Sequence, residues 1–304
     1  MINVGILGGT GPVAGELIRI LINHPDVMLR QVCEPELAGC DIKSQHHGLI
    51  GESNKQFVGE LDLLKLDVLF VNTQDHKLRR MIPTVDDAPD LCVIELAENF
   101  TDARIADPFV VYGVPEMNRK PLVRGARRAV IPPAAETLMC IALLPLAMHS
   151  MLPESLSILL ECNEALASVH RVDIENVQEQ MRVNGNDPAP AISVSFSPSD
   201  DRRAMRVSFV LDLPLPLDNI FSMYEDLYDD HNLTHVVSET VSADEVEGTD
   251  KCVISLDKTA DGRLSVQAIA DAGLRGGAGD AVHVMNLLKG LYEKTGLALK
   301  ASNL

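Results

Sequence analysis

The chain has 304 residues, of which 46% are hydrophobic. That is enough to bury two domain cores, and it excludes a disordered protein. The 44 acidic residues outnumber the 26 lysines and arginines, so the net charge is −18. This charge repels phosphate backbones and anionic lipid surfaces, and we expect no nucleic-acid partner. We also expect a cytoplasmic protein with no membrane contact, because the chain shows no signal peptide and no apolar run of about 18 residues.

The first 133 residues alternate short apolar runs with helical patterns. The runs expected to form strands are Ile2–Leu7, Val27–Val32, Val68–Val71, Cys92–Leu96, Phe109–Gly113 and Ala129–Ile131. Between the first two runs, Val13, Leu17 and Ile20 recur at helical spacing. This alternation predicts a doubly wound parallel sheet with helices on its faces.

The pattern changes near residue 155 to strands in which apolar residues alternate with polar ones. The alternating apolar residues are Ile192, Val194 and Phe196, followed by Met205, Val207, Phe209 and Leu211. Alternation predicts one buried and one polar face, as in an antiparallel sheet. Further strands are expected at Val253–Leu256 and Leu264–Ala270, with a helix from near Asp218. The second half is therefore predicted to be an α+β domain with a mainly antiparallel sheet.

The cysteines and histidines give little sign of a metal site. The six cysteines form no CxxC pair, and we expect reduced, mostly buried thiols. His231 and His235 have the i, i+4 spacing of two metal ligands on a helix, but no third ligand is evident. We interpret them as a pair at the surface end of a helix and predict no metal.

A glycine-rich loop joins the first strand to the first helix in VGILGGTGPVAGELIRIL, with Gly8 and Gly11 at the turn. Glycine permits a tight turn and lets a pyrophosphate approach the backbone, which is typical of dinucleotide-binding folds. Pro12 suits the first helical position but removes one N–H donor. The alternative is a strand-to-helix turn that binds nothing.

Four stretches carry a resemblance to a known family. They are GGTGPVAGELIRILINHPDV at the start, VYGVPEMNR at 111–119, LLPLA at 143–147 and GLRGGAGDAVHVMNLLKGLYEKTGL near the end. With this collinear set the chain resembles the N-acetyl- or N-succinyl-γ-glutamyl-phosphate reductases of arginine biosynthesis, which are related to the aspartate-semialdehyde dehydrogenases. The resemblance implies a Rossmann-type domain at 1–133 completed by 277–304, and a catalytic and dimerisation domain at 134–276. It also implies a cleft between them, a small-molecule ligand, and a homodimer or homo-tetramer.

The resemblance implies an NAD or NADP site on the first domain. The cofactor-binding residues that it implies are Gly8, Thr10, Gly11, Pro12, Val13, Glu34, Asn72, Thr73, Gly276 and Gly279. Glu34 stands where the family places small hydroxyl residues that receive the NADP 2′-phosphate, and a carboxylate there favours NAD. The chain could also bind no cofactor, with Glu34 a solvated residue at the end of a strand. Asp75 follows nearby, where it would not favour an anionic substrate.

The family's catalytic group is missing at the position where the resemblance places it. Family members look like NADP-dependent enzymes that reduce an acyl phosphate to an aldehyde through a thioester on a cysteine. That cysteine lies in an Asn-Pro-Gly-Cys turn that opens a helix, where the helix N-terminus favours the thiolate. Here the turn reads Ile131-Pro132-Pro133-Ala134. Ala134 has no nucleophile, so the thioester chemistry is expected to be lost.

Other candidate catalytic groups remain as alternatives. His170, in the run His170 to Ile174, matches the family's second catalytic group; the other interpretation is an ordinary surface histidine. Cys162, at the end of a predicted strand, could replace the lost thiol or fill the core, whereas Cys140 is expected in the core. Arg203 corresponds to a family arginine that meets the substrate carboxylate.

Three functions follow. The first is a divergent family member that keeps the NAD(P)-binding fold and has lost acyl-phosphate reduction. The second is an active NAD-dependent oxidoreductase that transfers hydride directly, with His170 as acid or base. The third is a regulatory partner that pairs with a true reductase through its antiparallel sheet.

Overall fold

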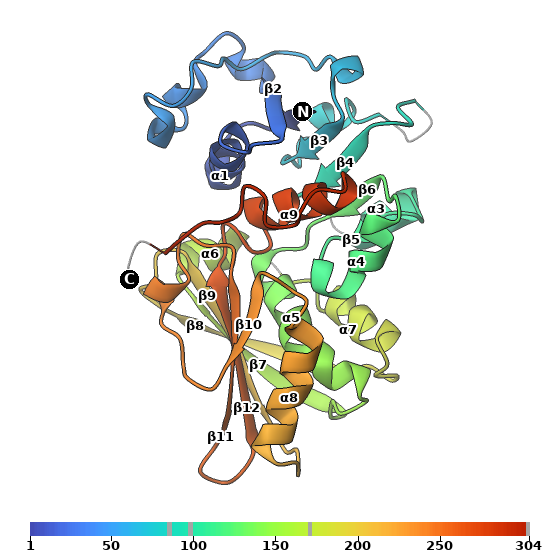
Figure 1. Cartoon of the computed structure of the whole chain (residues 1–304), viewed down its shortest axis with the longest axis vertical. Coiled ribbons are helices and arrows are strands. Elements are labelled where there is room, and N and C mark those ends of the chain that lie inside the picture. The colour runs from blue at the N-terminus through green and yellow to red at the C-terminus, as the bar shows by residue number, and fades with distance from the viewer. Residues whose placement is uncertain (84–86, 97–99, 170–171, 302–304) are drawn as a thin grey trace. The chain divides into compact units, whose positions relative to one another are not determined.

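The computed structural model describes residues 1–83, 87–96, 100–169 and 172–301 (Figure 1). The chain divides into two compact units. The first unit is formed by Met1–Pro132 with Gly277–Ala298, and the second mainly by Pro133–Gly276. Within the described ranges, no helix combines the length and the apolar character that crossing a membrane requires.

The first unit is built on a six-stranded sheet in which every pairing is parallel. In spatial order its strands are β2 (Val27–Cys33), β1 (Ile2–Leu7), β3 (Val68–Val71), β4 (Cys92–Glu95), β6 (Arg128–Val130) and β5 (Val111–Tyr112). The predicted doubly wound sheet is confirmed. The fifth strand is shorter than the predicted Phe109–Gly113, and Phe109 is 85% exposed outside it. The strand order reverses at β1, between β2 and β3, where sheets of this type bind ligands beyond the strand ends.

The helices of the first unit are α1 (Gly11–Ile22), α2 (His76–Arg79), α3 (Phe100–Ala106), α4 (Pro115–Val123) and α9 (Ala278–Leu288). Helix α1 forms as its spacing predicts, because Ala14, Leu17 and Leu21 fall on one buried face. Helix α9, from near the C-terminus, contacts both α1 and α4 and so belongs to the core of the first unit.

The second unit contains a mixed six-stranded sheet. In spatial order its strands are β10 (Thr234–Val237), β11 (Cys252–Lys258), β12 (Leu264–Asp271), β9 (Ala204–Leu211), β7 (Ser155–Cys162) and β8 (Ala191–Pro198). The three central pairings are antiparallel, as predicted for most of this sheet. The two edge strands instead pair parallel with their neighbours. A parallel pairing needs a crossover, and the segment between β7 and β8 provides one with α6 (Glu164–Val169) and α7 (Ile174–Val183).

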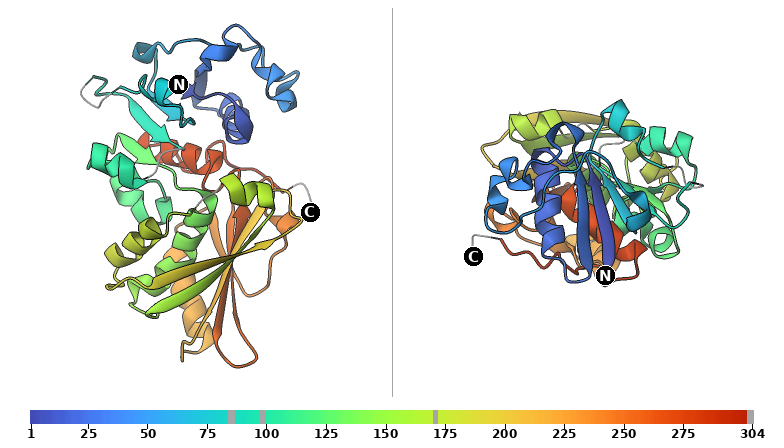
Figure 2. Two further views of the ribbon diagram at one scale, coloured as in Figure 1. Left: turned by 180° about the vertical axis from the view of Figure 1, so that it is seen from behind. Right: turned by 90° about the horizontal axis from the view of Figure 1, so that it is seen from above.

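Two longer helices, α5 (Ala134–Met148) and α8 (Leu217–Tyr228), lie on the same side of this sheet (Figures 1 and 2). Helix α5 contacts β9 and β12, and α8 contacts β10 and β11. The Tyr224 hydroxyl donates to the Ala142 carbonyl at 2.8 Å, and the Tyr228 hydroxyl donates to the Ile141 carbonyl at 2.5 Å. These bonds give two buried phenol groups a partner and tie the two helices together.

The prediction of a buried face on the strand at 191–198 is wrong. Val194 is 37% exposed and Phe196 is 45% exposed, although both alternate with polar residues as a half-buried strand would. The reason is that the two long helices do not extend over this edge strand, because α5 contacts β9 and β12 while α8 contacts β10 and β11. In β9, by contrast, Val207 and Phe209 are buried as predicted, because β9 lies between two strands and under α5.

Candidate dinucleotide site and catalytic position

The glycine loop lies at the strand-order reversal of the first sheet. Gly8 follows β1 directly, with φ +85°. A Cβ added there would lie 2.5 Å from the backbone oxygen of Asn72, so only glycine fits. Gly11 has φ +84°, but a Cβ added to it would have no atom within 4 Å. The backbone at Gly11 therefore faces open space, into which a pyrophosphate can come close.

Polar side chains from the ends of β2 and β3 converge on this loop. The Thr10 hydroxyl donates to the Glu34 carboxylate at 3.4 Å. The Asn72 amide donates to the carbonyls of Gly8 and Thr10, also at 3.4 Å each. The structure thus brings together five of the residues that the sequence analysis assigned to a cofactor, and the carboxylate of Glu34 faces the loop.

The remaining predicted cofactor residues of the first strands have defined local roles. Pro12 lies in the first turn of α1, where it supplies no N–H donor, and Val13 follows it half-buried. The Thr73 hydroxyl accepts the N–H of Asp75 at 3.1 Å. The Asp75 carboxylate caps α2 by accepting the Lys77 N–H at 2.7 Å. Asp75 therefore has a structural role at the start of that helix.

Gly276 and Gly279 occupy different settings. Gly279 lies buried in the first turn of α9. Gly276 has φ +62°, and a Cβ added to it would lie 2.3 Å from the backbone nitrogen of Ala134. In the second unit, the backbone of Gly276 therefore lies directly against the N-terminus of α5, where any side chain would collide.

Ala134 is the first residue of α5, after Pro133 at the N-cap, and it is fully buried. The helix therefore begins at the residue where the resemblance places the family cysteine. A helix N-terminus stabilises a thiolate through its unpaired N–H groups and its dipole. At this N-terminus the first residue is Ala134, whose methyl side chain cannot form a thiolate for the helix to stabilise.

Glu136 lies two residues further, in the first turn of the same helix, and is 2% exposed. Its carboxylate accepts the backbone N–H of Asp173 at 3.2 Å. Glu136 was not among the residues predicted for the site, although an acidic residue in the first turn of a helix is a recognisable favourable pairing with the helix dipole. A buried carboxyl group therefore lies in the helical turn at whose first residue the resemblance places the family cysteine.

The Glu136–Asp173 contact also joins the His170 to Ile174 run to the start of α5. Asp173 is the N-cap of α7, and its carboxylate accepts the N–H groups of Glu175 and Asn176. His170 itself lies outside the described residues. The part of the run that is described thus meets the first turn of α5, while the role of His170 stays a prediction.

The cysteine thiols that could replace the missing nucleophile are buried in the protein. Cys162 ends β7 and is fully buried, and burial raises the pKa of its thiol. Cys140 is fully buried inside α5. Cys33, at the end of β2, has its pKa raised to about 11, mainly by burial and further by the negative charges of Glu34 and Glu60. A reactive cysteine needs an exposed site and a lowered pKa. All three cysteines are buried, and the pKa values of Cys162 and Cys33 are raised.

Arg203, predicted to meet a substrate carboxylate, is paired with a carboxylate of its own chain. Its Nε lies 2.7 Å from Oδ2 of Asp271, and its Nη2 lies 3.0 Å from Oδ1. Asp271 is fully buried and also accepts the N–H groups of Gly248 and Gly273. This bidentate pair gives Arg203 a structural role beside the end of β12, and its contact with a substrate remains a prediction.

The two histidines with i, i+4 spacing do not share a helix, so that interpretation is wrong. Helix α8 ends at Tyr228, and His231 follows in a turn with its ring edge-on to that tyrosine. His235 lies in β10. Their i, i+4 spacing therefore does not place the two imidazoles on one face of a helix. Among the residues that the structure describes, no group of three or more His, Cys, Asp or Glu side chains could hold a metal ion.

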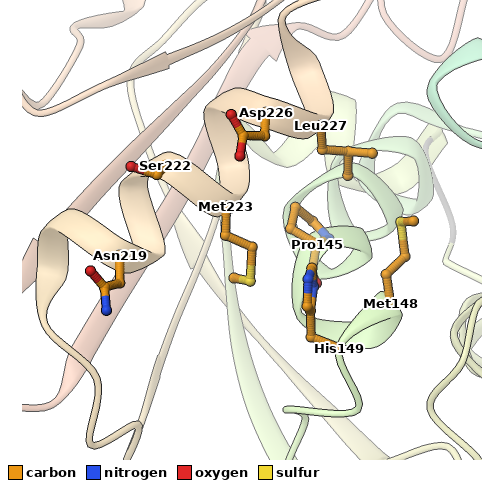
Figure 3. A pocket seen from close by; sticks show the side chains of 8 residues that line it. All are labelled: Pro145, Met148, His149, Asn219, Ser222, Met223, Asp226 and Leu227. Carbon is orange, nitrogen blue, oxygen red and sulfur yellow. The ribbon is translucent and has the colours of Figure 1, made fainter.

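A groove in the second unit lies between the C-terminal end of α5 and helix α8 (Figure 3). Its lining residues are Pro145, Met148, His149, Asn219, Ser222, Met223, Asp226 and Leu227. Met148 is fourteen residues from Ala134 on the same helix, which at 1.5 Å per residue is roughly 21 Å. The groove is therefore remote from the start of α5, where the resemblance places the family cysteine.

Comparison with known proteins agrees with this geometry. Residues 3–124 match the family model described as the NAD binding domain of semialdehyde dehydrogenase. The N-acetyl-gamma-glutamyl-phosphate reductases of Phocaeicola vulgatus and Parabacteroides distasonis are 31% and 33% identical to this chain, and each match covers 99% of both proteins. That of Bacteroides fragilis is 32% identical with the same coverage.

Solved structures share the fold. Aspartate semialdehyde dehydrogenase II from Vibrio cholerae superposes with a TM-score of 0.70 at 14% identity, covering 96% of this chain and 99% of that one. Aspartate semialdehyde dehydrogenase with NADP from Candida albicans gives the same score and identity, covering 95% and 98%. The expected resemblance is confirmed over the full length, and the chain belongs to the N-acetyl-gamma-glutamyl-phosphate reductase family.

Proposed function

We propose that the protein is a dinucleotide-binding member of its family that no longer reduces acyl phosphates through a thioester. The observation that carries this proposal is Ala134 at the first position of α5. A thioester needs a sulfur nucleophile, and a methyl group has no lone pair to attack a carbonyl carbon. In a serine protease, removing the covalent nucleophile lowered kcat about a millionfold, and we expect a loss of similar size in the thioester reaction of this chain.

Two further features of the second unit support the loss. The backbone of Gly276 closes on the nitrogen of Ala134, and the buried carboxylate of Glu136 stands in the same helical turn. An acyl phosphate approaching this turn would meet a buried carboxyl group and closely packed backbone at the helix N-terminus. The turn itself also differs from the family's Asn-Pro-Gly-Cys at more than one residue, since it reads Ile131-Pro132-Pro133-Ala134.

The cofactor half of the proposal rests on the first unit. The residues present fit a dinucleotide, since Gly11 leaves open space beside the start of α1 and Gly8 allows the tight turn before it. The N–H groups at the start of α1 would hold the pyrophosphate. A bound nicotinamide would supply hydride transfer, whereas this chain's own groups would bind and orient it.

We propose that NAD is preferred over NADP. The Glu34 carboxylate lies at the end of β2 and within 3.4 Å of the Thr10 hydroxyl. A carboxylate at this place accepts hydrogen bonds from ribose hydroxyls and repels a 2′-phosphate. Calorimetric titration tests this directly, with tighter binding of NAD⁺ than of NADP⁺ as the expected result. Absence of heat with both ligands would remove every oxidoreductase proposal for this chain.

A second function, direct hydride transfer to a carbonyl without an acyl-enzyme, is favoured by one observation. The run that contains His170 is joined to the first turn of α5 through the Asp173 N–H and Glu136. In this alternative His170 donates or accepts the proton that accompanies hydride transfer. Turnover of NADH on a panel of carbonyl compounds, abolished in His170→Ala, would establish it over the first proposal.

The second unit is also proposed to pair two chains, or to pair this chain with a true reductase, through its mixed sheet. Light scattering would give a mass of about twice 33.1 kDa for a homodimer. A mass near 33.1 kDa for the pure protein, together with co-purification of a reductase, would favour the regulatory partner instead.

A further inference from the structure

The segment between β2 and β3 places one imidazole against the glycine loop. His46 Nε2 lies 2.7 Å from the carbonyl oxygen of Gly9. Because a carbonyl oxygen can only accept, Nε2 carries the proton of this hydrogen bond. The other side of the ring rests on α1, where a Cβ at Gly15 would lie 2.7 Å from Nδ1. Glycine at position 15 is what lets the ring reach the loop.

The backbone around His46 is well anchored, so the ring is held in place. The His46 N–H donates to the Ile42 carbonyl at 3.1 Å, and its own carbonyl accepts the Leu49 N–H at 2.9 Å. Ile42 and Leu49 are both buried. This short segment is therefore a fixed support for the imidazole and not a loose loop tip.

The bond to Gly9 has a consequence for the neighbouring donor. The Gly9 carbonyl and the Thr10 N–H belong to one trans peptide plane and point in opposite directions. Holding the carbonyl toward His46 therefore fixes the direction of the Thr10 N–H. Within the described residues this N–H donates no hydrogen bond, and it stands just before the start of α1. Since Pro12 contributes no donor, each remaining N–H of the loop carries more of the anion binding.

We infer that His46 is a positioning residue for the cofactor pyrophosphate, acting through the Gly9–Thr10 peptide. The inference rests on the proposed dinucleotide site and adds a residue outside the glycine loop to it. His46 does not touch the pyrophosphate; it fixes the peptide whose N–H does. Loss of its hydrogen bond lets the peptide rotate, so binding then includes the cost of reordering it.

Two amide substitutions separate this role from simple packing. Glutamine places its Nε2 amide about where the histidine Nε2 lies, whereas asparagine is shorter and cannot reach the Gly9 carbonyl. His46→Asn should raise the NAD⁺ Kd about five- to tenfold, the size of one lost hydrogen bond. His46→Gln should stay within about twofold of the unaltered protein. Both Kd values are measured by calorimetry well below the melting temperature of each variant.

The outcomes are distinct. An unaltered protein that binds NAD⁺, with His46→Asn equal to it, overturns the role of His46 and leaves the dinucleotide site standing. His46→Gln as weak as His46→Asn also overturns it, because the donor would then not be the cause. No binding of NAD⁺ or NADP⁺ by the unaltered protein overturns the dinucleotide site and this role with it. His47→Asn, at the exposed neighbouring position, is the control and should bind as the unaltered protein does.

Discussion

The glycine loop allows a matched pair of substitutions, Gly8→Ala and Gly11→Ala. Both positions have nearly the same backbone conformation, with φ of +85° and +84°. Each alanine therefore incurs a similar penalty for the left-handed region, about 1–2 kcal/mol, partly offset by a less flexible unfolded chain. The surroundings differ, since a Cβ at Gly8 would lie 2.5 Å from the Asn72 oxygen and one at Gly11 meets no atom within 4 Å.

The overlap at Gly8 is with backbone, so β1 and the segment after β3 must move apart. Such overpacking costs typically about 1–3 kcal/mol. Gly8→Ala should therefore be less stable than Gly11→Ala by about 1–3 kcal/mol, measured as the free energy of unfolding in urea. The Gly11→Ala variant should keep the fold but weaken NAD⁺ binding, because its methyl group enters the open space beside α1. Equal stability of the two variants would refute the assigned loop geometry.

Three further outcomes are expected. Glu34→Gln should raise NADP⁺ affinity by about tenfold relative to NAD⁺ in competition titrations, since a carboxylate that repels the 2′-phosphate is removed; an unchanged ratio would contradict the assigned role. Asp271→Ala should lower the free energy of unfolding by about 2–4 kcal/mol, because it leaves the Arg203 guanidinium and the N–H groups of Gly248 and Gly273 without their acceptor. The control is Asp261→Ala, which removes an exposed ion pair and should change the free energy of unfolding little. Burial raises the pKa of Cys33 from 9.0 to about 11. The contribution of its neutral thiol to the free energy of unfolding is therefore fully present below pH 9 and is lost as the pH rises toward 11. At pH 8 a thiol reagent should label exposed Cys40 in the folded protein and reach Cys33 only after unfolding, as peptide mass mapping would show.

The parallel sheet of the first unit could be predicted from sequence because its strands are buried on both faces. Val68–Val71 and Cys92–Glu95 are continuous apolar or buried runs between clear turn signals, and the structure has strands at both. The tight turn at Gly8 was also predictable, because a glycine between a buried strand and a helix indicates a backbone conformation that other residues rarely adopt, and Gly8 has φ +85°. Local pattern and tertiary environment agree in this unit.

The second sheet shows where such patterns stop being informative. Val194 and Phe196 alternate just as Val207 and Phe209 do, but only the second pair is buried. Alternation reports that a strand has two different faces; it carries no information on whether the strand is central or at an edge. The parallel pairing of β8 likewise depends on a crossover through α6 and α7, which no feature within β8 itself encodes.

The contacts of His46 and Glu136, which sequence reasoning missed, join distant segments of the chain. His46 meets Gly9 across 37 positions, and Glu136 meets Asp173 across 37 as well. Neither forms part of a short motif, so no spacing pattern points to it. The opposite error occurred with His231 and His235, whose spacing suggested one helix although the helix ends at Tyr228.

The central claim is that no thioester forms at the start of α5, and the reverse reaction of the family tests it most directly. The purified protein is mixed with N-acetylglutamate semialdehyde, phosphate and either NAD⁺ or NADP⁺, and the appearance of reduced nicotinamide is followed by absorbance. With Ala134 at the nucleophile position, we predict no phosphate-dependent reduction above the rate without protein. Phosphate-dependent turnover at about 1 s⁻¹ or faster, within the range of ordinary enzymes, would contradict the account.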